Sequence, residues 1–181
     1  INELDARHQK PIKIKKQQVP TLEDALKLIS KSVRVVILDA KIGPPLYEKG
    51  LAEDILSIVK KTNCRNCVIW SKSDSLVAKI IKLTRDIAVG YVIMNDPSTG
   101  AQRKYTRIRS ADVVGVYHPL IDEKLVKTLH WSKKKVYAWT VDDVSSMHRV
   151  LRQNIDAIIT GKPSLLQDLM ENIQIECGKP G

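Results

Sequence analysis

A carboxylate and an ammonium lie one residue apart at the end of an apolar run in this sequence. The stretch VVILDAKIG, residues 35–43, has the pattern of a buried strand that ends in Asp39 and Lys41. Residues i and i+2 of a strand share a face, so the two charges point the same way. A carboxylate is an oxygen ligand for a hard divalent cation, and an ammonium can face a phosphate. The pair fits one part of a metal–phosphate site; a surface ion pair is the alternative.

Polar and aromatic side chains also end the later apolar runs. They are Trp70 and Ser71, Tyr117 and His118, Trp139 and Thr140, and Thr160 and Lys162. We interpret Trp139, Tyr117 and Trp70 as candidate residues of a substrate pocket. Packing inside the fold is the alternative for both tryptophans. His118 precedes Pro119, so a loop position is the alternative to a place in the pocket.

The elements that must position these residues alternate along the chain. Helical patterns cover residues 19–29 (with Thr21 as N-cap), 47–61, 73–86 (capped by Ser73 or Asp74), 122–132, 142–154 and 163–173. Strand patterns cover residues 33–41, 66–71, 87–94, 111–120, 135–141 and 155–161, with a polar loop over 95–110. The strands are continuous apolar runs, as is typical of parallel strands that are covered on both faces.

Strict alternation of strand and helix allows a doubly wound sheet or a (β/α)8 barrel. No glycine-rich phosphate loop follows the first strand, where a dinucleotide-binding sheet would carry one. The polar strand ends would also ring one mouth of a barrel, where barrel enzymes build their active sites. The sequence therefore predicts an α/β fold of the (β/α)8 TIM-barrel type, with about six of its eight βα units present.

Four motifs in order resemble the glycerophosphodiester phosphodiesterase family, most closely its plant members. They are VPTLEDAL, a strand that ends in acid-x-Lys, VYAWTVDD and DAIITGKPSLL, and the similarity runs from about Val19 to Ile173. The resemblance implies that the six strands are strands three to eight of the barrel. It also implies hydrolysis of glycerophosphodiesters to glycerol 3-phosphate and an alcohol, with a divalent metal, Mg or Ca, as cofactor.

The resemblance assigns roles to individual positions. Asp39 falls where the family has a metal-ligating Glu, Lys41 falls on the Lys that faces the substrate phosphate, and Trp139 falls on an aromatic pocket wall. Three positions depart from the family pattern: Asp39 is shorter than Glu, Asp142 replaces an Asn, and Gly161 replaces an Asp. The shorter Asp39 would move or weaken the metal, whereas the other two changes are expected to be tolerated.

The catalytic histidines and two of the three metal carboxylates belong to strands one and two of the family, and no such sequence occurs here. We therefore expect this chain to be an N-terminally truncated barrel that is inactive alone and binds metal weakly. A catalytically dead family member that serves as a binding or regulatory module is the alternative. A six-stranded barrel also leaves two open edges, which predicts aggregation, pairing edge to edge, or a need for the missing segment for stability.

Composition limits the remaining choices. The net charge is +10, with clusters at residues 13–16, 60–61 and 133–135. We interpret these as solvated surface, with an anion-binding role as the alternative, and expect no nucleic-acid partner. Cys64 and Cys67 have the spacing of half a zinc site with no second half, so we expect structural thiols and no disulfide framework. We expect a basic arm at 1–18, one domain at 19–175 and a tail at 176–181. No signal or transmembrane segment is recognisable, and the compartment stays open.

Overall fold

The fold is an alternation of parallel strands and helices, as a computed structural model of the chain shows. The structure describes residues 18–43, 48–95, 99–101 and 104–177. The strands are β1 (Val36–Asp39), β2 (Cys67–Ser71), β3 (Ala88–Ile93), β4 (Val113–Tyr117), β5 (Lys135–Trp139) and β6 (Ala157–Ile158). The helices are α1 (Leu22–Ile29), α2 (Leu51–Lys61), α3 (Asp74–Leu83), α4 (Glu123–Trp131), α5 (Val144–Leu151) and α6 (Pro163–Cys177).

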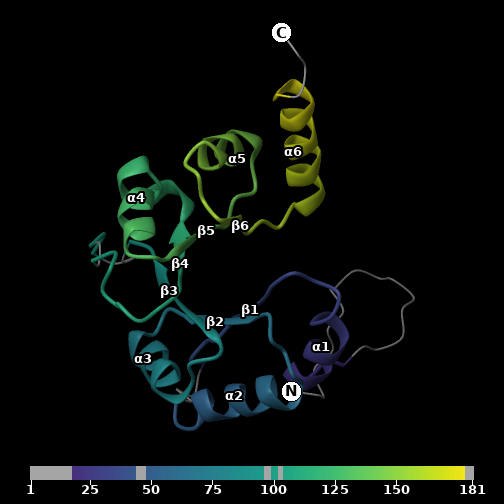
Figure 1. Cartoon of the computed structure of the whole chain (residues 1–181), viewed down its shortest axis with the longest axis vertical. Coiled ribbons are helices and arrows are strands. Elements are labelled where there is room, and N and C mark those ends of the chain that lie inside the picture. Colours follow the sequence, from purple (N-terminus) through teal and green to yellow (C-terminus); the bar gives the residue numbers. More distant parts are fainter. Residues whose placement is uncertain (1–17, 44–47, 96–98, 102–103, 178–181) are drawn as a thin grey trace.

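Strand order distinguishes the two folds that the alternation allows. All pairings are parallel, and the neighbours in the sheet follow chain order from β1 to β6. A doubly wound sheet would reverse its order at a switch point. Here the sheet curls instead, and the helices lie on its outer, convex side (Figure 1). The expected barrel type is therefore confirmed as a curled half-barrel, in which the described residues form six parallel strands with β1 and β6 at the edges.

Two apolar layers hold the half-barrel together. The larger layer lies between the sheet and the helices and contains Leu26, Ile69, Tyr91 and Met147, all fully buried. The smaller layer lines the concave side, where the Trp70 ring of β2 meets the Tyr137 ring of β5 at 6.4 Å between centroids. Two strands that are not neighbours in the sheet meet there because the sheet curls.

Two helices, α1 and α3, begin beside the capping residues that the sequence indicated. Thr21 caps α1 in a capping box with Asp24, and the side chain of Ser73 accepts the backbone N–H of Leu76 to cap α3. Helix α2 begins at Leu51, later than the expected residue 47, behind Gly50 in the left-handed region; residues 44–47 lie outside the described part of the chain.

The connection from β3 to β4 crosses the outer face without a described helix, as the polar pattern over 95–110 predicts. Its described part is fastened by three side chains. The Tyr91 hydroxyl donates to the carbonyl of Tyr105, and Arg107 makes two hydrogen bonds to the Asp74 carboxylate, at 2.8 and 2.9 Å. The buried Lys134 ammonium donates to the carbonyls of Ile108, Arg109 and Ala111, at 2.6 to 2.9 Å.

One expectation about the cysteines is wrong. Cys64 and Cys67 form a disulfide and are not free thiols. Asn63 adopts a left-handed backbone conformation, which turns the chain tightly between α2 and β2 and brings the two buried sulfurs together. Spacing alone did not indicate this turn.

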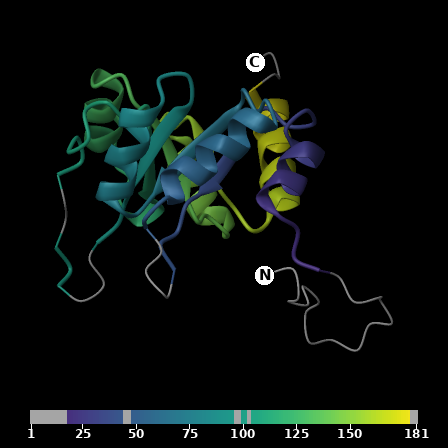
Figure 2. The same cartoon turned by 90° about the horizontal axis from the view of Figure 1, so that it is seen from below.

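The predicted boundaries at the chain ends are only partly observable. Residues 1–17 and 178–181 lie outside the described residues, and α6 runs two residues into the predicted tail. Within the described residues no helix combines the length and the apolar character that crossing a bilayer requires. Figure 1 shows α1 and α6 apart, on either side of the open part of the half-barrel, and Figure 2 gives the same fold from below.

Candidate functional site

The mouth of the half-barrel is formed by the carboxyl ends of the strands, and Asp39 and Lys41 lie there at the end of β1. Between them Ala40 is buried: its N–H donates to the Trp70 carbonyl at 2.9 Å, and its carbonyl accepts the Ser71 hydroxyl at 2.6 Å. Because neighbouring residues of an extended chain face opposite ways, this anchorage turns Asp39 and Lys41 away from the helices.

The two charges form the ion pair that the spacing suggests. The Lys41 ammonium lies 3.3 Å from the Asp39 carboxylate, and 76% and 45% of the two side chains are exposed. An exposed pair of this kind contributes about 0–1 kcal/mol, so the ammonium can leave the carboxylate for a phosphate at small cost. Lys41 can therefore take part in this ion pair and still be able to contact a phosphate.

An aromatic wall stands at the same mouth, at the ends of β4 and β5. The rings of Tyr117 and Trp139 lie 5.5 Å apart between centroids, and 39% of Tyr117 is exposed. The Lys72 ammonium, which follows β2, lies 5.5 Å from the centroid of the Trp139 ring. The sequence indicated the two aromatic residues but missed Lys72, although its place just after a strand end was a usable signal.

Trp70 lies deeper than Trp139. It is 6% exposed, and its ring fills the space above Gly115 of β4, where an added Cβ would come within 2.6 Å of the indole. Its indole N–H and that of Trp139 have no hydrogen-bond partner in the described part of the chain. Trp70 thus forms a floor beneath the mouth, and Trp139 a half-buried wall above it.

The loops that follow β5 and β6 are joined by Asp142. One oxygen of its carboxylate accepts the Gly161 N–H at 2.7 Å and the Thr160 hydroxyl at 3.0 Å. An added Cβ on Gly161 would lie 3.5 Å from both carboxylate oxygens. The two departures from the family pattern thus lie in contact: an Asp at 161 would bring a second carboxylate against Asp142, and Gly161 avoids this.

His118 is held from outside the sheet. Its Nδ1 lies 3.0 Å from the guanidinium of Arg149 on α5, which also donates to the His118 carbonyl at 2.9 Å. Burial lowers the pKa of His118, and the positive charge of Arg149 lowers it further. His118 therefore braces α5 against the end of β4. This contact agrees with the loop interpretation, and Arg149 is a partner that the sequence did not reveal.

The described residues do not by themselves fit a divalent metal. No group of three or more His, Cys, Asp or Glu side chains within them is arranged to hold a metal ion. Asp39 offers one carboxylate, whereas a hard cation requires several oxygen ligands. These residues alone therefore do not support a metal-assisted step.

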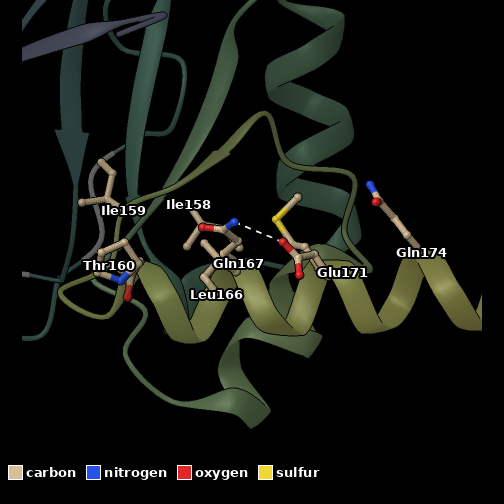
Figure 3. Close-up of a pocket in the computed structure, with 9 residues that line it drawn as sticks. Ile158, Ile159, Thr160, Leu166, Gln167, Glu171 and Gln174 are labelled. Carbon is tan, nitrogen blue, oxygen red and sulfur yellow. Dashed lines mark hydrogen bonds between the residues drawn. The ribbon is translucent and has the colours of Figure 1, made fainter. Parts of the chain in front are cut away.

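A groove of about 580 Å³ runs along the open edge of the sheet, between β6 and α6 (Figure 3). Thr160 stands at one end of it, and a 3.1 Å hydrogen bond from Gln167 to Glu171 follows the helix. Its remaining lining is largely apolar, including Ile158 and Leu166. The groove marks the unpaired side of β6 and contains none of the predicted pocket residues.

Comparison with known proteins relates these features to one family. The profile of the glycerophosphoryl diester phosphodiesterase family matches residues 1–165. Glycerophosphodiester phosphodiesterase GDPD4 of Arabidopsis thaliana is 52% identical over 181 residues, which are 100% of this chain and 55% of that protein. The chain thus spans about half the length of this curated relative.

Solved structures show the same fold. A glycerophosphodiester phosphodiesterase from Parabacteroides distasonis matches with a TM-score of 0.72 and 20% identity, over 88% of this chain and 67% of that one. An Oleispira antarctica phosphodiesterase in complex with the product sn-glycerol-3-phosphate matches with a TM-score of 0.72 and 20% identity, over 85% and 62%. The family match over most of the chain, together with the Arabidopsis relative, shows that this chain belongs to the glycerophosphoryl diester phosphodiesterase family.

Proposed function

We propose that this chain is part of a glycerophosphodiester phosphodiesterase, which hydrolyses a glycerophosphodiester to glycerol 3-phosphate and an alcohol. In this reaction water supplies the new oxygen on phosphorus, and the leaving alkoxide takes up a proton. The observation that supports the proposal most directly is the position of Lys41 beside Asp39 at the strand end that opens into the aromatic-walled mouth. The product bound by the Oleispira relative supports the same substrate class.

Each mouth residue receives a role under this proposal. Lys41 neutralises charge on the phosphoryl oxygens, which stabilises a transition state in which that charge grows. Trp139 and Tyr117 form the wall against the glycerol or alcohol carbons, and Trp70 supports that wall from below. Lys72 adds a second positive charge at the rim, held over the Trp139 ring.

Asp39 supplies one carboxylate to a divalent cation, Mg or Ca, in the complete enzyme. The other ligands and the acid–base groups then have to come from outside the described residues, because these residues contain no such cluster. The 181-residue chain alone is accordingly expected to hydrolyse nothing and to bind metal weakly. The isolated chain and the complete enzyme are therefore expected to differ in activity and in metal binding.

The length of the native protein is the first test. Intact mass and N-terminal sequencing of protein from its natural source show whether residues precede Ile1. If they do, hydrolysis of glycerophosphocholine is assayed in that longer protein with Lys41→Met, and with Lys49→Met as the control on an exposed Lys. A loss of at least about tenfold in kcat/KM for Lys41→Met alone supports the proposal. Equal activity of all three proteins contradicts it.

The alternative function is that of a catalytically silent binding module. It is favoured by the observation that the described residues contain no group of three or more His, Cys, Asp or Glu side chains that could hold a metal ion. A native protein that starts near Ile1, binds glycerol 3-phosphate through Lys41 and shows no hydrolysis would establish this alternative. Calorimetry with Lys41→Met detects the loss of that binding.

The open sheet edges are proposed to make the isolated chain associate with itself. β1 and β6 each have one paired side only among the described strands, and the groove along β6 is largely apolar. Unpaired edges of this kind recruit further strands. A small-molecule glycerophosphodiester and a second copy of the chain are therefore the expected partners, with no nucleic acid.

A further inference from the structure

The face opposite the mouth gathers positive charge and exposed apolar side chains. We define the basic face by the turns from α2 to β2, α3 to β3 and α4 to β5. Its exposed cations include Lys60, Arg65, Lys82, Arg85, Lys133 and Lys135. These three turns, residues 60–67, 82–87 and 131–135, contain one acid, Asp86. Parallel pairing of the strands places all three turns at the same end of the half-barrel.

Helix electrostatics accounts for only part of this charge. Lys60 and Lys82 lie in the last turns of α2 and α3, where a cation offsets the helix dipole. Arg65, Arg85 and Lys133 follow the helix ends and lie outside those turns. Their positions need another explanation, because the dipole effect falls off within one turn.

Two large apolar side chains project from the same face. Trp131 ends α4 and is 90% exposed, and Leu83 ends α3 and is 50% exposed. An indole that projects almost completely into solvent gains nothing from packing within the chain. Tryptophan is enriched at the level of lipid headgroups, where its apolar ring and polar N–H find both environments.

A groove of about 810 Å³ lies between the first two of these turns. Lys60, Arg65 and Arg85 line it together with one acid, Asp86, and with Leu83 and the aliphatic Ile87. Cationic walls beside apolar side chains match a phospholipid headgroup with the start of its acyl chains. A nucleic acid would use the cations but would leave Leu83 without a partner.

Part of the basic face has its backbone fastened by hydrogen bonds. Lys134 fastens the turn before β5 to the segment that enters β4, through its hydrogen bonds to the carbonyls of Ile108, Arg109 and Ala111. The Asp112 carboxylate accepts the Val89 N–H at 3.0 Å, which fastens that segment to β3. The turn before β5 and the segment that enters β4 are therefore in place before a partner binds, which lowers the entropic cost of docking.

We propose that the basic face docks on an anionic phospholipid bilayer, with Trp131 and Leu83 in the interfacial region and Arg65, Arg85 and Lys133 at headgroup phosphates. The mouth then opens toward water, where deacylated glycerophosphodiesters are dissolved. The docking does not depend on catalysis, since no mouth residue takes part. Each cation near such a surface contributes enough to change binding about fivefold.

Vesicle sedimentation tests the proposal with the 181-residue chain. The probes are vesicles of phosphatidylcholine alone and of phosphatidylcholine mixed with phosphatidylserine, with a tube that lacks vesicles as the control for aggregation. We expect binding to the mixed vesicles only, and a decline as salt rises. The double variant Arg65→Glu with Arg85→Glu should bind at least about tenfold more weakly. Lys49→Glu with Lys162→Glu, the same charge change on the mouth side, should bind within about twofold of the wild type.

Tryptophan fluorescence gives a second readout, because the chain contains 3 tryptophans and Trp70 is buried. The emission should shift to the blue on mixed vesicles, and Trp131→Phe should abolish that shift. If the double variant fails to fold, judged by circular dichroism, Lys82→Glu replaces it with an expected loss above about fivefold.

Three results would overturn the proposal. The first is equal weakening by the two double variants, which would mean that the total charge alone drives binding. The second is binding that survives Arg65→Glu with Arg85→Glu, which would place the contact on another segment. The third is an RNA oligonucleotide that binds at lower concentration than the vesicles and leaves Trp131 emission unshifted, which would identify a polyanion site.

Discussion

The Lys72 ammonium lies 5.5 Å from the centre of the Trp139 ring, although β3 and β4 stand between their strands in the sheet. The contact spans the concave side of the curled sheet, at the mouth where Asp39 and Lys41 also lie. A cation over an indole fixes the position of both groups. The rim of the candidate site is therefore organised by a contact between side chains 67 positions apart, from Lys72 to Trp139.

Loss of this contact should affect substrate binding more than turnover. In the longest natural protein that contains these residues, Trp139→Leu removes both the aromatic wall and the platform for Lys72. We expect KM for glycerophosphocholine to rise about three- to tenfold with a smaller change in kcat, since under the proposed function the wall would contact the substrate in ground and transition states alike. Steady-state kinetics measures this, with Trp131→Leu on the opposite face as the matched control. A fall in kcat with unchanged KM would contradict the assignment.

Asp142 and Gly161 should behave as a coupled pair. Gly161→Asp brings a second carboxylate beside Asp142, and we expect it to lower the free energy of unfolding by about 1–2 kcal/mol. Adding Asp142→Asn restores the family combination and should recover most of that loss. Urea denaturation of the wild type, both single variants and the double variant gives the interaction energy. Additive single effects would show that the two departures are independent.

His118 should make the protein less stable in mild acid. Burial and Arg149 lower its pKa in the folded state, so below pH 6.5 the unfolded chain takes up a proton that the folded chain does not. Stability should therefore fall as the pH drops from 6.5 through the lowered pKa. His118→Asn keeps an acceptor for Arg149 but cannot titrate, and it should flatten this slope. The wild type and the variant share the other three of the 4 histidines. The difference between the urea midpoints of the two proteins across this pH range therefore measures the contribution of His118.

Reduction of the Cys64–Cys67 disulfide should destabilise the chain and loosen the segment between α1 and β1. The loop closed by this disulfide is four residues long, for which the loop-entropy relation gives about 2 kcal/mol. Within it the Asn66 side chain donates to the carbonyls of Ser30 and Val33, at 2.9 and 2.8 Å. Denaturation with and without dithiothreitol measures the loss, and hydrogen exchange shows where protection falls.

The control for that prediction is the double variant Cys64→Ser with Cys67→Ser, which should respond no further to dithiothreitol. An unchanged midpoint in the wild type on reduction would show that the disulfide does not hold the fold. Faster exchange confined to α6 would show that Asn66 is not the link to α1.

Sequence patterns predicted the parts of the fold that depend on local chemistry. Apolar runs located the six strands that the structure describes, and Thr21 and Ser73 marked helix starts because their caps are made with residues three positions away. Resemblance to the family placed Asp39 and Lys41, which the structure brings together at a strand end. The roles of these residues in catalysis remain predictions.

What the sequence did not reveal depends on the path of the chain in space. The partner of His118 is Arg149, 31 residues away, and neither residue carries a local signal for the contact. The Cys64–Cys67 bond lies just after a left-handed turn at Asn63, and the spacing of the two cysteines indicated neither. Lys72 reaches Trp139 only because the sheet curls. Such contacts follow from tertiary packing, which no pattern in a short window contains.

Self-association should depend on the two open edges of the sheet. β1 and β6 are the edge strands, and Val35 before β1 and Met170 on α6 are 44% and 43% exposed. Charges near an edge oppose strand pairing, so Val35→Lys with Met170→Glu should shift the chain toward monomer. Analytical ultracentrifugation over a concentration series measures this, with Leu83→Lys on the basic face as the control. A wild-type chain that stays monomeric throughout would show that the edges are already protected, and the proposed association would then be wrong.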